Sequence, residues 1–175
     1  MKIKSTITFF ILLFQTILAF SQTNSGAVIF NLKFSSFNET GFGGKIKIIN
    51  TATQTAFTGK SSNRLTSQIA IQNLPKGNYS VVELTIRTGS GQINYLDSSK
   101  FNQIEIYEGR TSYLGMYKTK KSPPIFKLNY EILSDKNIDV EKIKKQSLKI
   151  TGSESEIDFS QKLLKSDTTY FSIKF

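Results

Sequence analysis

Apolar and polar residues alternate along much of the chain, with the period of two that is typical of half-buried β-strands. The pattern is first clear at Val28–Phe34, where Val28, Phe30 and Leu32 alternate with Ile29 and more polar residues. It recurs at Lys45–Ile48, Ile69–Ile71, Tyr79–Arg87, Phe101–Tyr107, Ser112–Lys118 and Phe126–Ile132. Turn residues separate these segments at intervals of roughly ten positions. The sequence therefore predicts an all-β fold: a single sandwich of about seven strands over residues 26–132, with one helix and a short terminal strand pair appended.

Two segments carry a more specific expectation. In Tyr79–Arg87, strict alternation places Val82, Leu84 and Ile86 on one face of the strand. The chain ends in Tyr170–Phe175, which is rich in β-forming residues and is predicted to be a last short strand.

A single helix is predicted from Asn137 to about Lys149. Asn137 is a good N-cap residue, acidic residues follow in the first turn, and lysines accumulate towards the end. Val140, Ile143 and Leu148 fall on one face of this helix. The acidic start also resembles the first positions of a calcium loop, but such a loop needs glycine where Val140 stands, so we interpret it as a helix start.

The first residues have the pattern of a secretory signal peptide, spanning residues 1–21. Lys2 and Lys4 precede an interrupted apolar stretch, and Ala19 and Ser21 are the small residues that a cleavage site requires. We expect cleavage after Ser21, a periplasmic or extracellular location, and no transmembrane segment in the mature chain. The predicted organisation is a leader (1–21), a β-sandwich domain (22–133), and a basic helix with a C-terminal strand extension (134–175).

Two segments together resemble a known family. Leu74-Pro75-Lys76-Gly77-Asn78-Tyr79, placed between two strands, is similar to the turn of carboxypeptidase-regulatory-like modules, which have a transthyretin-like (prealbumin) β-sandwich. Ile104–Gly115 is similar to the strand, glycine turn and Tyr-x-Gly stretch near the end of related exported bacterial modules. The resemblance covers roughly residues 26–132. It implies an immunoglobulin-like sandwich and a non-catalytic accessory or adhesive role.

The composition excludes several kinds of active site. The chain contains neither cysteine nor histidine, so it has no Cys/His zinc site and no Ser-His-Asp or Cys-His nucleophile. We expect no metal and no cofactor. Catalysis would have to use carboxylates, lysine or tyrosine. The enzymatic alternative is therefore a carboxylate-based hydrolase acting on envelope glycans, although no spacing singles out a pair among Glu83, Glu105 and Glu108.

Charge is the clearest asymmetry of the chain, whose formal net charge is +10. Nine lysines lie between residues 118 and 149, against four acidic residues. The candidate contacts to an anionic partner are Lys118, Lys120, Lys121, Lys142, Lys144 and Lys145. Export argues against nucleic acid as that partner and favours an anionic envelope polysaccharide or another envelope protein. Ordinary solvated surface charge remains the alternative explanation.

The first-ranked function is accordingly an exported, non-catalytic binding or scaffolding module of the bacterial cell envelope. Two roles stay open for the C-terminal extension: it completes the sheet, or it docks the protein onto a partner.

Overall fold

The protein is described by a computed structural model that covers residues 25–34, 43–61, 67–88, 91–95, 98–122, 129–135, 138–152 and 154–172. These residues are mainly β-strand, as the alternation predicted. The strands of the first half are β1 (Ser25–Phe34), β2 (Gly43–Asn50), β3 (Ala56–Ser61), β4 (Ser67–Pro75), β5 (Gly77–Thr88) and β6 (Gly91–Tyr95). The later strands are β7 (Ile104–Ile106), β8 (Arg110–Ser122), β9 (Asn129–Asp135), β10 (Glu156–Asp158) and β11 (Thr168–Ser172). The helical elements are a short 3-10 turn, η1 (Ser98–Lys100), and α2 (Val140–Thr151).

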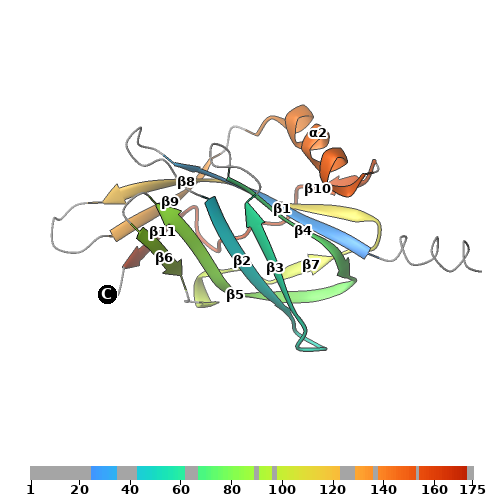
Figure 1. Ribbon diagram of the computed structural model, residues 1–175, viewed down its shortest axis with the longest axis horizontal. Coiled ribbons are helices and arrows are strands. Elements are labelled where there is room, and N and C mark those ends of the chain that lie inside the picture. Colours follow the sequence, from blue (N-terminus) through green and yellow to red (C-terminus); the bar gives the residue numbers. More distant parts are fainter. Residues whose placement is uncertain are drawn as a thin grey trace, which may run out of the picture.

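All eleven described strands belong to one sheet, in the order β11-β9-β8-β1-β4-β3-β2-β5-β6 (Figure 1). β7 pairs with β5 and β10 pairs with β8, both beside this main path. The pairings are antiparallel except for those of β8 with β1 and with β10. The all-β class is thus confirmed. A separate two-sheet sandwich of seven strands is not confirmed, because the described strands form a single curled sheet.

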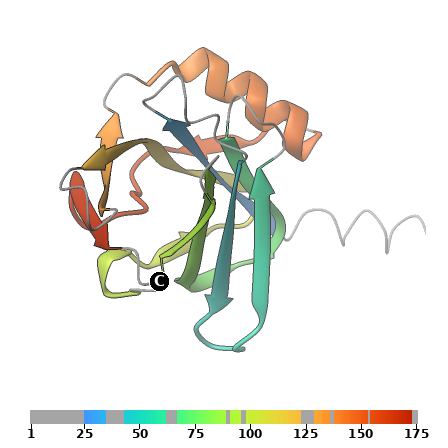
Figure 2. The same ribbon diagram turned by 60° about the vertical axis from the view of Figure 1, so that its left-hand side comes forward.

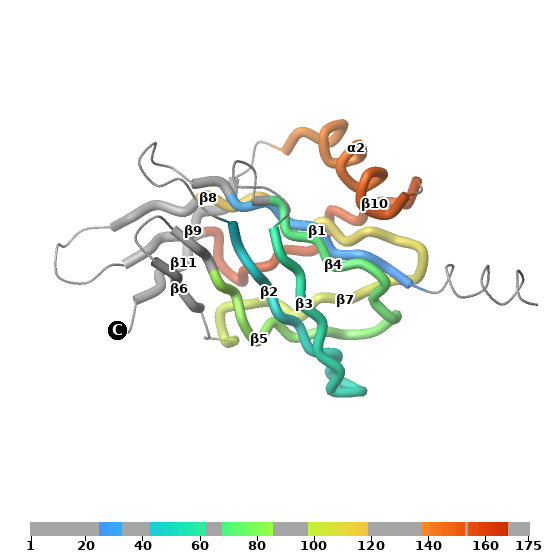
Figure 3. Tube along the Cα trace, viewed as in Figure 1, coloured from blue at the N-terminus to red at the C-terminus, as the bar shows by residue number. Residues whose placement is uncertain are grey.

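The sheet curls until its two sides meet near the C-terminal segment (Figure 2). Phe101 forms an isolated antiparallel bridge with Leu164. The Asn102 backbone N–H donates to the Leu163 carbonyl at 2.9 Å, and the Leu163 N–H donates to the carbonyl of Leu114 in β8 at 3.1 Å. The segment after β10 therefore links the chain before β7 to β8 (Figure 3).

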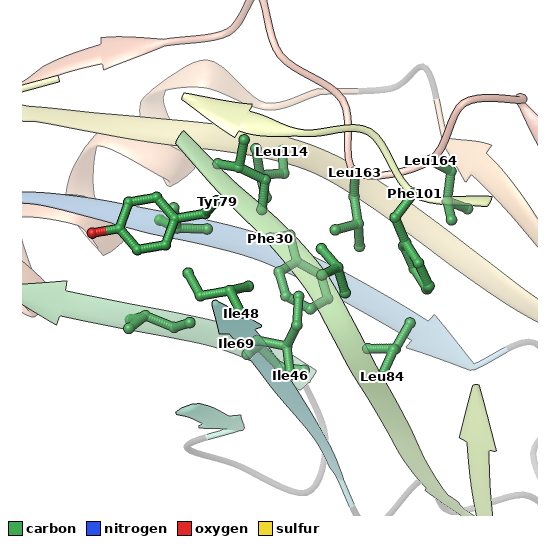
Figure 4. Packing of buried hydrophobic residues seen from close by; sticks show 14 of the residues in the cluster. Phe30, Ile46, Ile48, Ile69, Tyr79, Leu84, Phe101, Leu114, Leu163 and Leu164 are labelled. Atoms are coloured by element: carbon green, nitrogen blue, oxygen red, sulfur yellow. The ribbon is translucent and has the colours of Figure 1, made fainter. Parts of the chain in front are cut away.

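The hydrophobic core fills the inside of the curl. Side chains from distant strands meet there, among them Phe30, Ile46 and Leu84, all of which are buried (Figure 4). Leu163 and Leu164 belong to the same cluster. Of the two roles left open for the extension, the structure therefore places its β10 and β11 strands in the sheet and these two leucines in the core.

Helix α2 covers the outer surface of the curl. Ile143 packs there with Ile29 of β1 and Tyr113 of β8 in a second buried cluster. Ile29 was expected on the polar side of a half-buried strand; it is buried because α2 supplies a second apolar layer. The face predicted for the helix is wrong in part: Ile143 and Ser147 are buried, whereas Val140 and Leu148 are exposed.

The helix cap also differs from the prediction. The N-cap is Asp139, whose carboxylate accepts from the Lys142 N–H at 3.0 Å. Asn137, the predicted cap, lies outside the described residues. Gly152 ends the helix in the left-handed region at φ 74°, and its N–H donates to the Leu148 carbonyl, as glycine commonly does.

A bulge changes the faces of β5. Lys47 of β2 is opposite Glu83, but the next residue, Ile48, is opposite Val81, so Val82 is the extra residue. An extra residue reverses the alternation on one side of the bulge. Val81 and Leu84 are consequently buried while Val82 is half-buried, which corrects the expectation that Val82 and Leu84 share a face.

The predicted signal peptide (residues 1–21) and its cleavage site after Ser21 fall within residues 1–24, which lie outside the described part. Within the part of the chain that is described, no helix has the length and apolar character needed to cross a bilayer.

Candidate functional site

Three hollows in the described surface adjoin helix α2. The helix groove, about 550 Å³, lies between α2 and β10. The Arg110 pocket, about 430 Å³, lies at the C-terminal end of α2. A third hollow, about 330 Å³, lies against β3 and β4 beside Ile150. Docking a helix on the outside of a curved sheet therefore creates all three candidate sites.

The helix groove is lined by both charged and apolar residues. Its lining residues are Glu141, Lys144, Lys145, Ser147, Leu148, Glu154, Ser155, Glu156, Ile157 and Phe159. Leu148 is 45 % and Phe159 39 % exposed, and both line this groove. The Phe159 ring is held against Tyr113, with ring centroids 5.6 Å apart.

Two of the three glutamates of the helix groove are ion-paired. Glu141 pairs with Lys144 at 3.0 Å on the same helix, and Glu156 pairs with Arg110 at 3.0 Å. Such exposed pairs contribute little stability, but they neutralise charge locally. Lys145 and Glu154 complete the charged lining.

A cluster of hydroxyl groups joins α2 to the sheet beneath both the helix groove and the Arg110 pocket. Ser147 of α2 donates to the Thr111 hydroxyl at 3.1 Å, and the Thr111 and Ser155 hydroxyls lie 2.8 Å apart. The Ser147 and Ser155 hydroxyls are 3.3 Å apart. Three hydroxyls can satisfy one another in such a ring, which explains why a serine, and not an apolar residue, occupies the buried face of α2.

The Arg110 pocket is more polar. Its lining residues are Ser25, Gly26, Ala27, Gln72, Asn73, Gly109, Arg110, Thr111, Thr151, Gly152 and Ser155. Arg110 begins β8 directly after the turn at Gly109, and its guanidinium lies 5.8 Å from the centroid of the Tyr107 ring. Asn73, with φ 54°, is a non-glycine residue in the left-handed region.

The third hollow contains one unsatisfied polar group. The side-chain nitrogen of Gln68 is buried without a hydrogen-bond partner, and Phe57 lines the same hollow. Phe57 packs edge-on against Tyr79, with ring centroids 5.8 Å apart.

Two of the described carboxylates, those of Glu83 and Asp158, have separate hydrogen-bond partners. Hydrogen bonds from Gln161 and Ser160 lower the pKa of the Asp158 carboxyl, and a hydrogen bond from Thr85 lowers that of Glu83. The general acid of a glycosidase needs the opposite shift. No described contact brings Glu83 or Asp158 together with a second carboxylate.

The predicted lysines lie on two elements. Lys142, Lys144 and Lys145 are exposed on the first turns of α2, and two of them line the helix groove. Lys118, Lys120 and Lys121 lie in the C-terminal half of β8. Lys118 is half-buried, and the side chains of the other two are outside the described part.

Sequence reasoning missed Arg110 and Phe159 as site residues. In the sequence, Arg110 falls within the Ile104–Gly115 stretch and Phe159 within the C-terminal extension (134–175), and no pattern singles out either residue. Both residues adjoin the hollows because α2 and β10 pack beside β8. This packing joins distant parts of the chain, so no local sequence pattern predicts it.

Comparison with known proteins gives no further assignment: no protein-family profile, no curated protein and no solved structure matches this chain.

Proposed function

We propose that this protein is an exported, non-catalytic binding or scaffolding module of the cell envelope, and that it contacts its partner through α2 and the adjoining helix groove. The carrying observation is the groove itself, where Lys144 and Lys145 lie beside the exposed apolar side chains of Leu148 and Phe159. Exposed apolar groups rimmed by charge are characteristic of interaction surfaces.

The charge of α2 favours an anionic polymer as the partner. The helix carries four lysines against one glutamate. Lys142 and Lys149 are seven residues apart, or about 10 Å along the axis, so this charge spans more than one unit of a polymer. Two of the groove glutamates are already ion-paired, which reduces their repulsion of an anion.

The resemblance to carboxypeptidase-regulatory-like sandwiches supports a non-catalytic role, and the transthyretin-like fold remains part of this proposal. The Leu74–Tyr79 motif that carries the resemblance forms the connection from β4 to β5. Export rests on the signal-like pattern of residues 1–21. Mass spectrometry of the exported protein should find Gln22 at the N-terminus, and recovery of the form that begins with Met1 would contradict it.

The test replaces Lys142, Lys144 and Lys145 together by glutamate. We expect elution from an anionic polysaccharide matrix at a clearly lower salt concentration than for the parent, because these contacts are screened over about 8 Å at physiological salt. A matched control reverses Lys76, Lys162 and Lys165, which are exposed and belong neither to α2 nor to the lining of the helix groove.

The two triple variants have the same net charge. If they elute together, binding follows total charge and α2 is not the contact surface. A selective loss in the α2 variant, with an unchanged thermal midpoint, supports the proposal.

A further inference from the structure

The charges that line the helix groove nearly cancel one another. Its two ion-paired glutamates are each neutralised by a cation at 3.0 Å. The charged residues that remain on the lining are Lys145 and Glu154, one of each sign. The groove is therefore close to neutral, although α2 as a whole carries four lysines against one glutamate. A densely charged polyanion gains no net attraction from the groove itself, because Lys145 attracts it and Glu154 repels it.

The other lysines of α2 form a separate strip beside the groove. Lys142 and Lys149 are exposed and lie seven positions apart, so they are on the same side of the helix. Neither of them lines the groove, whereas Lys145 does. At 3.6 residues per turn, Lys145 lies within about 60° of both around the helix axis. This lysine strip (Lys142, Lys145 and Lys149) thus reaches the groove at Lys145.

The exposed apolar side chains of the groove come from two elements, Leu148 from α2 and Phe159 from the residues just after β10. The Phe159 ring is held against the ring of Tyr113, which is buried. The turn around Phe159 is fixed by Asp158, whose carboxylate accepts from the Ser160 N–H at 2.8 Å and from its hydroxyl at 2.6 Å. A ligand that contacts this ring therefore costs little side-chain freedom.

This combination of groups suits a sugar ring better than a phosphate or sulfate group. A sugar ring has an apolar C–H face and a rim of hydroxyl groups. Leu148 and Phe159 can contact such a face, and the Glu154 carboxylate can accept hydrogen bonds from hydroxyls. The groove volume of about 550 Å³ lies within the usual range for small-ligand sites, about 300–1,000 Å³.

We propose that the helix groove binds an uncharged sugar unit of an acidic polysaccharide, while acidic groups of neighbouring units contact the lysine strip. The partner is then a polymer that contains both neutral and acidic sugars, and Leu148 and Phe159 select it over a polymer with a charge on every unit. The inference rests on the proposed function, because it requires the lysines of α2 to contact the polymer.

The test is a heteronuclear NMR titration of the full chain with two anionic ligands. A hyaluronan oligosaccharide carries a carboxylate on every second sugar, whereas polyphosphate is charged at every unit and has no sugar. The oligosaccharide should shift the backbone amides of Leu148 and Phe159. Polyphosphate should shift those of Lys142 and Lys149 and leave that of Phe159 unchanged.

Substitutions in the groove test its selectivity. Phe159→Ala should weaken oligosaccharide binding by about 3–10-fold, because an aromatic contact is lost, and should leave polyphosphate binding unchanged. Leu148→Ala should weaken oligosaccharide binding by about 2–5-fold. Because Leu148 is exposed on the helix, this variant keeps the test decisive even where Phe159→Ala is unstable. Ile138→Ala is the matched control: Ile138 is 41 % exposed but does not line the groove, so binding should not change.

The joint reversal of Lys142, Lys144 and Lys145 distinguishes this inference from the proposed function, since it should weaken the binding of both ligands. If it does so while Phe159→Ala and Leu148→Ala bind the oligosaccharide as the parent does, the inference is overturned and the proposed function stands. If the reversal changes neither ligand, the proposed function fails and the inference fails with it. An equal loss of both ligands in the groove variants, or no binding of the oligosaccharide at millimolar concentration, would also overturn the inference.

Discussion

Tyr117 ties the core to the C-terminal segment through its phenol group. The hydroxyl donates to the Leu114 carbonyl at 2.6 Å and accepts from the Leu163 N–H at 2.9 Å. The residue is 2 % exposed, and burial raises the pKa of its hydroxyl to about 12. A phenol in this position satisfies backbone groups where the sheet closes, which an apolar side chain would leave with fewer partners.

Replacing Tyr117 by phenylalanine tests this contact. At neutral pH we expect the free energy of unfolding to fall by about 1–2 kcal/mol, because two hydrogen bonds are lost. The Leu163 N–H keeps its bond to the Leu114 carbonyl, which limits the cost. Urea unfolding of the parent and the variant measures the difference.

The raised pKa of Tyr117 makes this difference depend on pH. Between pH 10 and about 12 the unfolded chain loses the tyrosine proton while the folded protein keeps it. The parent therefore loses roughly 2–3 kcal/mol of stability over this range, and Tyr117→Phe does not. The gap between the two proteins should shrink and reverse as the pH rises. A constant gap would show that the hydroxyl is not buried.

At the scale of elements, helix α2 organises the outer surface, and its cap is open to a direct test. Asp139→Ala should cost about 1 kcal/mol, because the carboxylate no longer accepts from the Lys142 N–H. Asn137→Ala, at the cap position predicted from the sequence, is the matched control and should cost much less. Denaturant unfolding and far-UV circular dichroism give the two values. A larger loss of unfolding free energy for Asn137→Ala than for Asp139→Ala would mean that Asn137 is the N-cap.

The burial of strand residues was predictable from the sequence where the alternation of apolar and polar residues alone determines it. It was not predictable where it depends on a neighbouring strand or segment. Alternation located β1 and predicted Ile104 and Ile106 on one face, and both are buried. It misassigned Val82, since a bulge depends on the register with β2. It also missed buried Ser147, because the hydroxyls that pair with Ser147 come from other segments.

The candidate site was less accessible to sequence reasoning. Lysine density indicated Lys144 and Lys145, which do line the helix groove. Arg110 is separated by more than forty positions from Glu156, its ion-pair partner, and from Thr151 and Gly152, which share its pocket. These four residues come together only because α2 and β10 pack beside β8.

At the scale of the whole molecule, residues after β9 complete a sheet whose other strands come from residues 25–135. Leu163 is 1 % exposed and lies in the main core with residues from β1, β2 and β5. Leu163→Ala should destabilise the protein by about 2–5 kcal/mol. Leu148→Ala, at a 45 % exposed helical position, should change stability by less than about 0.5 kcal/mol. Equal effects on thermal unfolding would contradict the core assignment.

Truncation after Ser134 removes all of these closing contacts at once. The shortened chain loses Ile143 from the outer cluster, Leu163 and Leu164 from the core, and the β10 strand that pairs with β8. The Tyr117 hydroxyl and the Leu114 carbonyl both lose the hydrogen bond from the Leu163 N–H, and apolar surface of the core becomes exposed. Because a domain is stable by only about 5–15 kcal/mol, losing several buried side chains together exceeds that margin. We expect the truncated chain to show no cooperative thermal transition and a poorly dispersed NMR spectrum. A cooperative transition near that of the full chain would instead mean that the C-terminal segment is an accessory free to dock onto a partner.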